Sequence, residues 1–227
     1  MASSQRVKLK LTLFDLDHTL LSGDSDVLWC EFLMDKGLLE REVFAAANSD
    51  MELRYKAGTV GTREFADFYL STLAGKSPAQ WERLRREFLD RQVVPRIPDA
   101  ASKLVQEHLA AGDLVVMTTA TNRFITELTA LHFAIEHLLA TEPEMVDGVF
   151  TGRASGTLNM RQGKVTRLHE WLATRGEVLG SFRAKAYSDS INDLPLLEAV
   201  DEPCCIDPDQ RLAAIAQERG WPVLRIH

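Results

Sequence analysis

The stretch at residues 7–21, VKLKLTLFDLDHTLL, decides the fold and marks a candidate site. It first alternates, then becomes continuously apolar, and stops at Asp15-Leu16-Asp17. Such a run is typical of a buried parallel strand, and open α/β sheets bind ligands at the carboxyl ends of these strands. Asp15 and Asp17 share one face of an extended chain, so both carboxylates can point into one site. A polar loop with a helix cap is the structural alternative for this segment alone.

Further strands alternate with amphipathic helices along the chain. Strands are predicted at residues 114–118, 184–187, 204–206 and 222–226. Helices are predicted at residues 99–111, 122–132, 165–175, 194–200 and 209–219. This alternation predicts an α/β fold, a Rossmann-like parallel sheet with helices on both faces. Asp147-Gly148, within residues 144–155, adds a hairpin signal.

Residues 24–96 interrupt the alternation, because they show helix periods and no convincing strand. The periods fall at residues 27–35, 39–46, 51–56, 63–73 and 79–91. Since a parallel crossover needs only one helix, the excess predicts a small all-α cap inserted after the first strand. We expect the cap at residues 22–97 and a discontinuous core at residues 1–21 and 98–227.

Composition narrows the class of protein. The chain has 227 residues and a net charge of −7, which argues against nucleic acid as a partner. It has no apolar run long enough for a membrane segment. Its three cysteines, Cys30, Cys204 and Cys205, are an odd number and are expected to be buried thiols in a reducing compartment. The predicted location is cytoplasmic.

Chemically active residues follow two more of the predicted strands. Thr119 and Ala120 precede a helix, whose free N–H groups favour phosphate. Gly163-Lys164 precedes the helix predicted from Val165, and Ser188-Asp189-Ser190-Ile191-Asn192-Asp193 ends a strand. Taken singly, Thr119 is more often a cap and Lys164 more often a solvated side chain. Together, acids, a hydroxyl and a lysine after successive parallel strands predict one phosphate site.

The order and spacing of these segments resemble the haloacid dehalogenase superfamily of aspartyl-nucleophile phosphatases, in the branch that contains phosphoserine phosphatase. DLDHTL resembles the first motif, VVMTTAT the second, Gly163-Lys164 the third and SDSIND the fourth. The fourth motif departs from the family pattern, because Ser188 and Ser190 stand at positions that are commonly glycine.

The resemblance implies a Mg²⁺-dependent phosphomonoester hydrolase. Asp15 is the implied nucleophile that forms an aspartyl-phosphate, and Asp17 the implied general acid and base. The implied Mg²⁺ ligands are Asp15, Asp189 and the backbone carbonyl of Asp17. The implied contacts to phosphate come from Thr119, Ala120 and Lys164, with Asn192 and Asp193 supporting the site around them.

Substrate choice falls to the cap, because the core motifs meet only the phosphate. His18, Asp24 and Arg54 are candidate substrate contacts, although an arginine on an amphipathic helix usually faces solvent. The expected substrate is a small phosphorylated metabolite such as phosphoserine or histidinol phosphate. A phosphotransferase, a lipid-phosphate phosphatase and a non-enzymatic phospho-receiver remain as alternatives. Nucleotide-binding glycine loops are disfavoured, since neither Gly75-Lys76 nor Gly163-Lys164 has the first glycine of such a loop.

Overall fold

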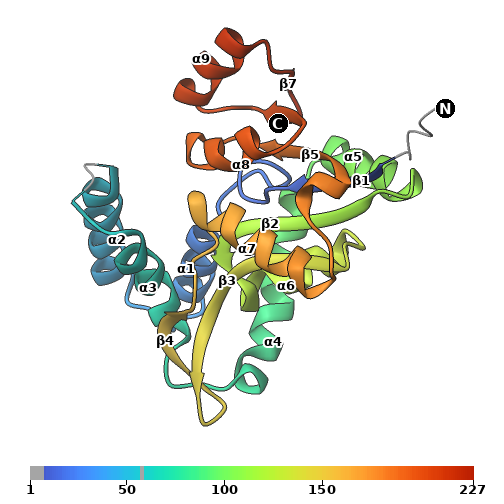
Figure 1. Ribbon diagram of the computed structural model, residues 1–227. Coiled ribbons are helices and arrows are strands. Elements are labelled where there is room, and N and C mark those ends of the chain that lie inside the picture. Colours follow the sequence, from blue (N-terminus) through green and yellow to red (C-terminus); the bar gives the residue numbers. More distant parts are fainter. Residues whose placement is uncertain (1–7, 57–58) are drawn as a thin grey trace, which may run out of the picture.

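A mostly parallel sheet forms the centre of the protein (Figure 1). The computed structural model describes residues 8–56 and 59–227, and the start of the first predicted strand, Val7, lies outside this range. Within it the strand order is β4-β3-β2-β1-β5-β6-β7. The strands are β1 (Leu9–Phe14), β2 (Leu114–Asn122), β3 (His137–Val146), β4 (Val149–Ser155), β5 (Phe182–Ser188), β6 (Glu202–Ile206) and β7 (Val223–Leu224). The predicted α/β fold is confirmed.

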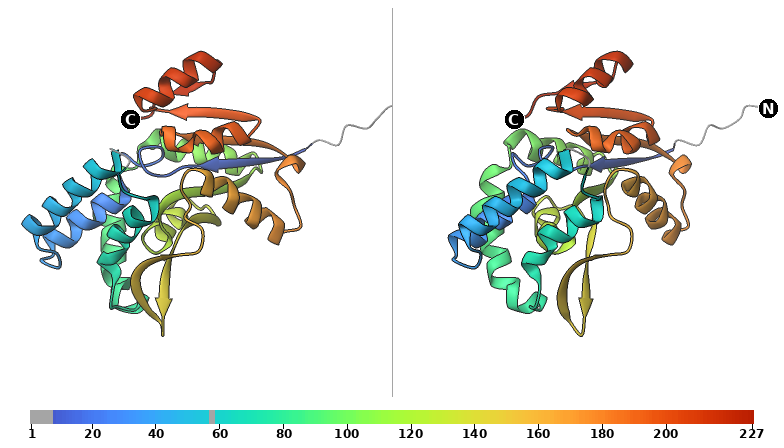
Figure 2. Two further views of the ribbon diagram at one scale, coloured as in Figure 1. Left: turned by 60° about the vertical axis from the view of Figure 1, so that its left-hand side comes forward. Right: turned by 90° about the vertical axis from the view of Figure 1, so that its left-hand side faces the viewer.

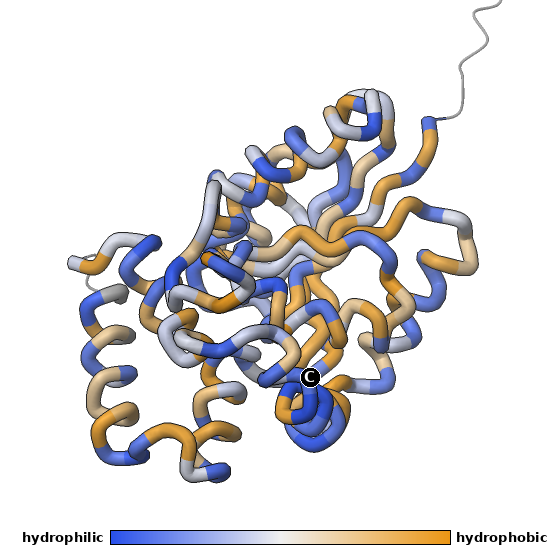
Figure 3. Tube along the Cα trace, turned by 90° about the horizontal axis from the view of Figure 1, so that it is seen from below, coloured by the Kyte–Doolittle hydropathy of each residue, from blue (hydrophilic) through white to orange (hydrophobic). Residues whose placement is uncertain are grey.

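The strand that carries the deciding sequence lies in the middle of the sheet. Leu13 of β1 pairs with Val116 of β2 on one side and with Ala186 of β5 on the other, both in parallel. Figure 3 shows hydrophobic residues concentrated along the central strands. With both neighbours in place and both faces covered, β1 is buried from Leu11 onward, which explains its nearly continuous apolar sequence.

Helices cover both faces of this sheet. The face that carries Leu11 and Leu13 packs against α7 (Gln162–Thr174), α8 (Leu194–Ala199) and α9 (Gln210–Arg219). The opposite face, which carries Phe14, packs against α5 (Asp99–Ala110) and α6 (Arg123–His132). Cys30, Cys204 and Cys205 are buried free thiols, as predicted. In the described part of the chain, no helix combines the length and the apolar character that a bilayer crossing requires.

At the edge of the sheet, the sequence predicted the hairpin between β3 and β4 but not the parallel part of β3. The hairpin at Asp147-Gly148 is confirmed, but β3 begins already at His137 and pairs in parallel with β2 before it turns antiparallel to β4. The parallel part of β3 is a short apolar run, 138–140, that follows helix α6 almost directly, so its pattern merges with that of the helix.

Between β1 and α5 the chain is helical. It forms α1 (Ser25–Asp35), α2 (Arg41–Lys56), α3 (Thr62–Leu70) and α4 (Pro78–Phe88). Helix α4 is followed directly by a π turn, Leu89–Val93, and a 3₁₀ turn, Val94–Arg96. Figure 2 shows these helices together at the end of the sheet toward which β1 points. Residues 39–46 and 51–56 were predicted as two helices, but α2 is continuous from Arg41. Asn48 breaks the apolar pattern between the two predicted helices but does not end α2. Its side chain instead makes a tertiary contact, because its Oδ1 accepts a hydrogen bond from Tyr69 at 2.8 Å.

Three contacts seat this helical insertion on the rest of the protein. At its base, the Ser22 N–H donates to the carbonyl of Arg96 at 2.9 Å, so the entering and leaving chains are bonded to each other. On its flank, Arg63 of α3 donates to the carbonyl of Ala154 in β4 at 2.7 Å. Asp67 of α3 accepts from the Ala154 N–H at 2.7 Å. The β3–β4 hairpin at the edge of the sheet therefore supports the insertion from the side (Figure 1).

Candidate active site

Asp15 follows β1 directly and is held between the sheet and a buried lysine. Its N–H continues the ladder by donating to the carbonyl of Tyr187 at 3.0 Å. Its Oδ1 accepts from Lys164 Nζ at 2.7 Å, and the same Nζ donates to Asp193 Oδ2 at 2.6 Å. Lys164 and Asp193 are only 2% and 3% exposed, so this is a buried ion-pair network that fixes the orientation of Asp15.

Thr19 joins Asp15 to the loop that follows β5. Its hydroxyl lies 2.9 Å from Asp15 Oδ2 and 3.1 Å from Asp189 Oδ1, and it accepts from the Asp189 N–H at 3.1 Å. Thr19 reaches this place because residues 16–21 form a tight turn, in which the Leu16 carbonyl accepts from three successive N–H groups. His18 takes a positive φ of 57° in this turn. The carboxylates of Asp15 and Asp189 therefore face the same point, with one hydroxyl proton to share.

Asp17 points away from this pair, toward the insertion and β2. Its Oδ1 accepts from the N–H and the hydroxyl of Ser25, at the start of α1. Its Oδ2 accepts from the hydroxyls of Thr119 and Thr121 at 3.1 and 2.8 Å. The carboxyl of Asp17 is thus fixed by three hydroxyl groups from two different parts of the chain.

Lys164 reaches the site because its loop packs tightly against the sheet. Helix α7 begins at Gln162, three residues before its predicted start, so Lys164 lies in the first turn rather than before the helix. A Cβ at Gly163 would lie 2.0 Å from the carbonyl oxygen of Leu158, so only glycine fits there. The loop that leads into α7 is also bonded to the sheet by the fully buried Asn159. Its side chain donates 2.9 Å hydrogen bonds to Thr118 Oγ1 and to the carbonyls of Thr119 on β2 and Leu139 on β3.

The end of β2 forms the opposite wall. Thr119 is fully buried and its hydroxyl contacts Asp17, whereas Ala120 and Thr121 line the cavity. Asn122 was predicted as the first residue of a helix. It is instead the N-cap of α6, and its side chain accepts from the Ile125 N–H at 3.2 Å.

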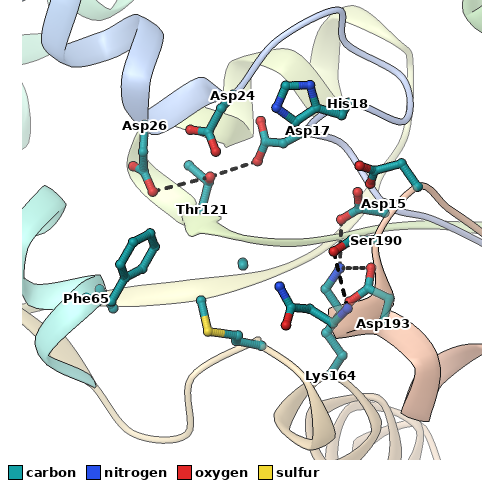
Figure 4. Close-up of a pocket in the computed structure, with 15 residues that line it drawn as sticks. Asp15, Asp17, His18, Asp24, Asp26, Phe65, Thr121, Lys164, Ser190 and Asp193 are labelled. Atoms are coloured by element: carbon teal, nitrogen blue, oxygen red, sulfur yellow. Dashed lines mark hydrogen bonds and ion pairs between the residues drawn. The ribbon is translucent and has the colours of Figure 1, made fainter. Parts of the chain in front are cut away.

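These groups surround a cavity of about 230 Å³, the size of a small metabolite. Figure 4 shows Lys164, Asp193 and Ser190 on one side, and Asp24, Asp26 and Phe65 on the other, with Phe65 contributed by α3 of the insertion. Among the described residues, the cavity is lined by Asp15, Asp17, His18, Asp24, Asp26, Phe65, Ala66, Ala120, Thr121, Met160, Lys164, Asp189, Ser190, Asn192 and Asp193.

Burial and neighbouring charges shift the pKa values of the titratable groups in the cavity. Burial raises the pKa of Asp15 to about 7; the Lys164 charge opposes this shift and the Asp193 charge adds to it. Burial, together with the Asp15 charge, raises the pKa of Asp189 to about 8. Burial by itself lowers the pKa of Lys164, but attraction to Asp15 and Asp193 outweighs it and raises that pKa, so Lys164 is charged. The described residues of the site carry more acidic groups than Lys164 can neutralise.

This surplus fits a divalent cation with hard oxygen ligands. Asp189 forms no ion pair with a lysine, arginine or histidine in the described part of the chain, and it shares a hydroxyl proton with Asp15. Among the described residues, no three carboxylate, histidine or cysteine side chains converge on one point. Two carboxylates completed by a backbone carbonyl and waters are the donor set that Mg²⁺ prefers. The donor set therefore fits the predicted ion.

Comparison with known proteins settles the family. A model of haloacid dehalogenase-like hydrolases matches residues 12–198. The chain belongs to this family. It is 40% identical to a histidinol-phosphatase of Neisseria meningitidis, covering 94% of this chain and 97% of the relative. It is 34% identical to a phosphoserine phosphatase of Mycobacterium tuberculosis, covering 92% and 68%. The family and these names confirm the predicted class of enzyme, a phosphatase.

Solved structures agree with this hydrolase fold. A protein of unknown function from Bordetella pertussis shares 43% identity and a TM-score of 0.93, covering 97% of this chain and all of that one. A substrate-bound phosphoserine phosphatase has a TM-score of 0.66 at 15% identity, covering 97% of this chain and 94% of that one, which shows a shared fold.

The structure brings most of the predicted site residues of this hydrolase together. Thr119 lies buried behind the cavity wall, with its hydroxyl on Asp17, and Arg54 lies outside the site. Asp15, Asp17, His18, Asp24, Ala120, Lys164, Asp189, Asn192 and Asp193 all line the cavity. Arg54 was predicted to meet the substrate, but it does not line the cavity. Its guanidinium pairs with Glu64 at 2.9 Å and Asp50 at 3.5 Å, because it faces along the exposed side of α2 and α3.

Sequence reasoning missed Asp26, Thr121 and Thr19. Asp26 stands in the first turn of α1, where an acidic residue is ordinary, so nothing in its local pattern marks a site. A usable signal was the spacing: Asp24 and Asp26 repeat the two-residue interval of Asp15 and Asp17, and Thr121 stands two residues after Thr119.

Proposed function

We propose that the protein is a Mg²⁺-dependent phosphomonoester hydrolase that works through an aspartyl-phosphate on Asp15. The observation that carries this proposal is the buried carboxylate of Asp15 at the end of β1, bonded to Lys164 at 2.7 Å and sharing the Thr19 hydroxyl with Asp189. Mg²⁺ bound by Asp15, Asp189 and the Asp17 carbonyl would supply positive charge to the nucleophile and the phosphate. The family membership and the phosphatase relatives support the same reaction.

The proposed reaction consists of two successive displacements at phosphorus. A carboxylate oxygen of Asp15 attacks phosphorus, the bond from phosphorus to the alkoxy oxygen breaks, and Asp17 gives its proton to the leaving alkoxide. Asp17 next takes a proton from a water, which attacks phosphorus and releases inorganic phosphate and free Asp15. The hydroxyls around Asp17 suit both states, because a hydroxyl can turn from donor to acceptor when Asp17 gains a proton.

The remaining residues hold the phosphoryl group and the nucleophile. The Ala120 N–H and Lys164 are the proposed phosphate ligands, since both lie on the cavity wall. Asp193 keeps Lys164 in place, and Asn192 lies on the wall beside it. Thr119 was predicted to bind phosphate directly. Its hydroxyl is engaged with Asp17, so we propose that it chiefly orients Asp17.

Phosphate release by the purified full chain tests the proposal. We expect hydrolysis of para-nitrophenyl phosphate, phosphoserine or histidinol phosphate in Mg²⁺, reversible loss in EDTA, and loss by at least about 10³-fold in Asp15→Asn and in Asp17→Asn. Asp35→Asn is the matched control, because Asp35 is an exposed aspartate at the end of α1 that pairs with Arg41. Full activity of Asp15→Asn would refute the mechanism. A stable phospho-form without turnover would indicate a receiver, and transfer to an added alcohol in preference to water a phosphotransferase.

A further inference from the structure

Strand β2 bulges at the point where it reaches the cavity. Its pairing with β3 breaks after Thr119 and resumes at Asn122, while β3 advances by a single residue, so Ala120 and Thr121 are extra. Both extra residues line the cavity. Bulges are rare between parallel strands, and these two residues have left the ladder that would otherwise hold them. The bulge, defined as residues 119–121, therefore needs contacts from outside the two strands.

The bulge holds one oxygen of Asp17, the proposed general acid. The hydroxyls of Thr119 and Thr121 both donate to Asp17 Oδ2, at 3.1 and 2.8 Å. Within the bulge, the Thr121 N–H donates to Thr119 Oγ1 at 3.1 Å, which leaves the Thr119 proton for Asp17. Figure 4 shows Thr121 bonded to Asp17 at the cavity wall. The direction in which this carboxyl points therefore follows the position of the bulge.

Asn159 anchors the bulge from behind. It lies in the loop before α7 and is fully buried. Its Nδ2 lies 2.9 Å from the carbonyl of Thr119 in the bulge, 2.9 Å from the carbonyl of Leu139 on β3, and 2.9 Å from Thr118 Oγ1. Its backbone N–H donates to Thr141 Oγ1 on β3 at 3.2 Å. One asparagine thus bridges β2 and β3 at the place where their own pairing is interrupted.

The orientation of the Asn159 amide is fixed by its neighbours. A carbonyl oxygen only accepts hydrogen bonds, so the NH₂ group and not Oδ1 must face Thr119 and Leu139. Within the part of the chain that the structure describes, the buried Oδ1 then has no hydrogen-bond partner. An unsatisfied buried oxygen is destabilising, and an apolar side chain that merely filled the space would not carry this cost. The two protons of the amide therefore explain this asparagine better than its volume does.

We propose that Asn159 is a positioning residue for the general acid: its amide fixes the bulge, and the hydroxyls of the bulge aim Asp17 at the leaving oxygen. The inference rests on the proposed function, because it assumes that Asp17 protonates the leaving alkoxide. Without the amide, the carbonyls of Thr119 and Leu139 lose the donor that they share, and the bulge can shift. A misplacement of about 1 Å caused by a residue remote from the chemistry can slow a reaction by roughly 10²-fold.

A matched pair of aryl phosphates separates proton donation from the other steps. Phenyl phosphate and para-nitrophenyl phosphate carry the same phosphate on the same ring, but nitrophenolate leaves readily without a proton, whereas phenolate gains much more from one. Single-turnover release of the two phenols, in Mg²⁺ and with the protein in excess, measures the first displacement alone. The readout is the rate for phenyl phosphate divided by the rate for para-nitrophenyl phosphate. Changes in phosphate binding, metal binding or the folded fraction affect both rates and cancel in this ratio.

Asn159→Ala removes the amide and is expected to lower this ratio by roughly tenfold. Asp17→Asn lacks the acid and should give the lowest ratio. Thr12→Val is the matched control, because Thr12 is also buried in the sheet and its hydroxyl donates to Asp113 at 3.1 Å, but it pairs with Val115, well before the bulge. This control loses a buried hydrogen bond and should keep the ratio of the unmodified protein. An unchanged ratio in folded Asn159→Ala would overturn the inference.

Thr141→Val is a milder variant that keeps the inference testable even if Asn159→Ala does not fold. Valine has the shape of threonine but cannot accept the hydrogen bond of the Asn159 N–H. Asn159 is then held less firmly, and we expect the ratio to fall by about twofold or more. If Asn159→Ala does not fold, an unchanged ratio in Thr141→Val would overturn the inference.

The proposed function and the inference fail in different ways. If neither aryl phosphate releases its phenol, the proposed function is wrong. If both react and Asp17→Asn keeps the ratio of the unmodified protein, the proposed role of Asp17 as general acid is wrong. If Asp17→Asn lowers the ratio and folded Asn159→Ala does not, the proposed function stands and the positioning role of Asn159 is wrong.

Discussion

The two ends of the cavity differ in how well their charged groups are satisfied. At the core end, Asp15, Lys164 and Asp193 form hydrogen bonds of 2.6 and 2.7 Å. At the opposite end, beside the helical insertion, the two contacts of Asp26 with Thr121 and Asn122 are both 3.4 Å. The core end is preorganised before any ligand arrives, which is what a site for a constant group such as phosphate requires. At the end beside the insertion, Asp26 is held less tightly, by hydrogen bonds at the outer limit of length.

Apart from the loss of Asp15 or Asp17 themselves, the largest effect is expected from removing the lysine of the core end. Lys164→Met keeps the length of the side chain but leaves Asp15 and Asp193 buried without a positively charged partner. We expect kcat to fall roughly 10²- to 10³-fold. The free energy of unfolding, measured by urea denaturation, should fall by about 3–5 kcal/mol. Lys185→Met, at a lysine that is 31% exposed, should leave both quantities nearly unchanged. Activity of Lys164→Met near that of the unmodified protein would contradict a preorganised core end.

A smaller loss is expected from Gly163→Ala, which disturbs the core end without removing a charge. The added Cβ would lie 2.0 Å from the Leu158 carbonyl, so the loop must shift and carry Lys164 with it. We expect a destabilisation of about 1–3 kcal/mol together with a lower kcat. Gly180→Ala is the control, because a Cβ there meets nothing within 4 Å. Equal stability of the two variants would show that the loop tolerates the shift.

Mg²⁺ should stabilise the core end in a pH-dependent way. Without metal, the pKa values of Asp15 and Asp189 are raised to about 7 and about 8, so the folded state holds protons that the unfolded chain has released. Stability of the metal-free protein should therefore fall as pH rises from about 4 toward 8. Mg²⁺ can replace those protons, so its increment in Tm should be a few degrees at pH 8 and nearly absent at pH 5.

Thermal unfolding in EDTA and in Mg²⁺ measures this increment at both pH values. Asp189→Asn should abolish the increment at pH 8, because it removes one of the two proposed carboxylate ligands. The same increment at pH 5 and pH 8 would argue that Mg²⁺ binds elsewhere than between Asp15 and Asp189.

The smallest effect is expected at Arg54. Its exposed ion pairs with Asp50 and Glu64 lie outside the cavity, so Arg54→Ala should change kcat/KM for phosphoserine and for phosphoethanolamine by less than about twofold. A selective loss for phosphoserine would place a substrate carboxylate at Arg54 and would contradict its position outside the cavity.

The same comparison explains what the sequence could predict. The core end was predictable because Asp15, Lys164 and Asp189 stand at the ends of strands or the start of a helix, where chain direction alone brings residues together. The end of the cavity beside the insertion was not predictable, because Asp26 and Phe65 belong to different helices, and their meeting depends on how those helices pack. Arg54 was misplaced for the same reason: a helical pattern does not tell which polar residue turns toward the core and which pairs along the surface.

The hydrogen bond between Ser22 and Arg96 has a consequence for how such a protein can evolve. The helical insertion leaves the chain after β1 and returns to it before α5 through two residues that are hydrogen-bonded to each other, so the positions of β1 and α5 do not depend on the length of the chain between them. Because the entropy of closing a loop grows only slowly with its length, insertions at this point are cheap. New substrates can therefore be acquired by exchanging or reshaping the helices while the strands that carry the chemistry stay in register.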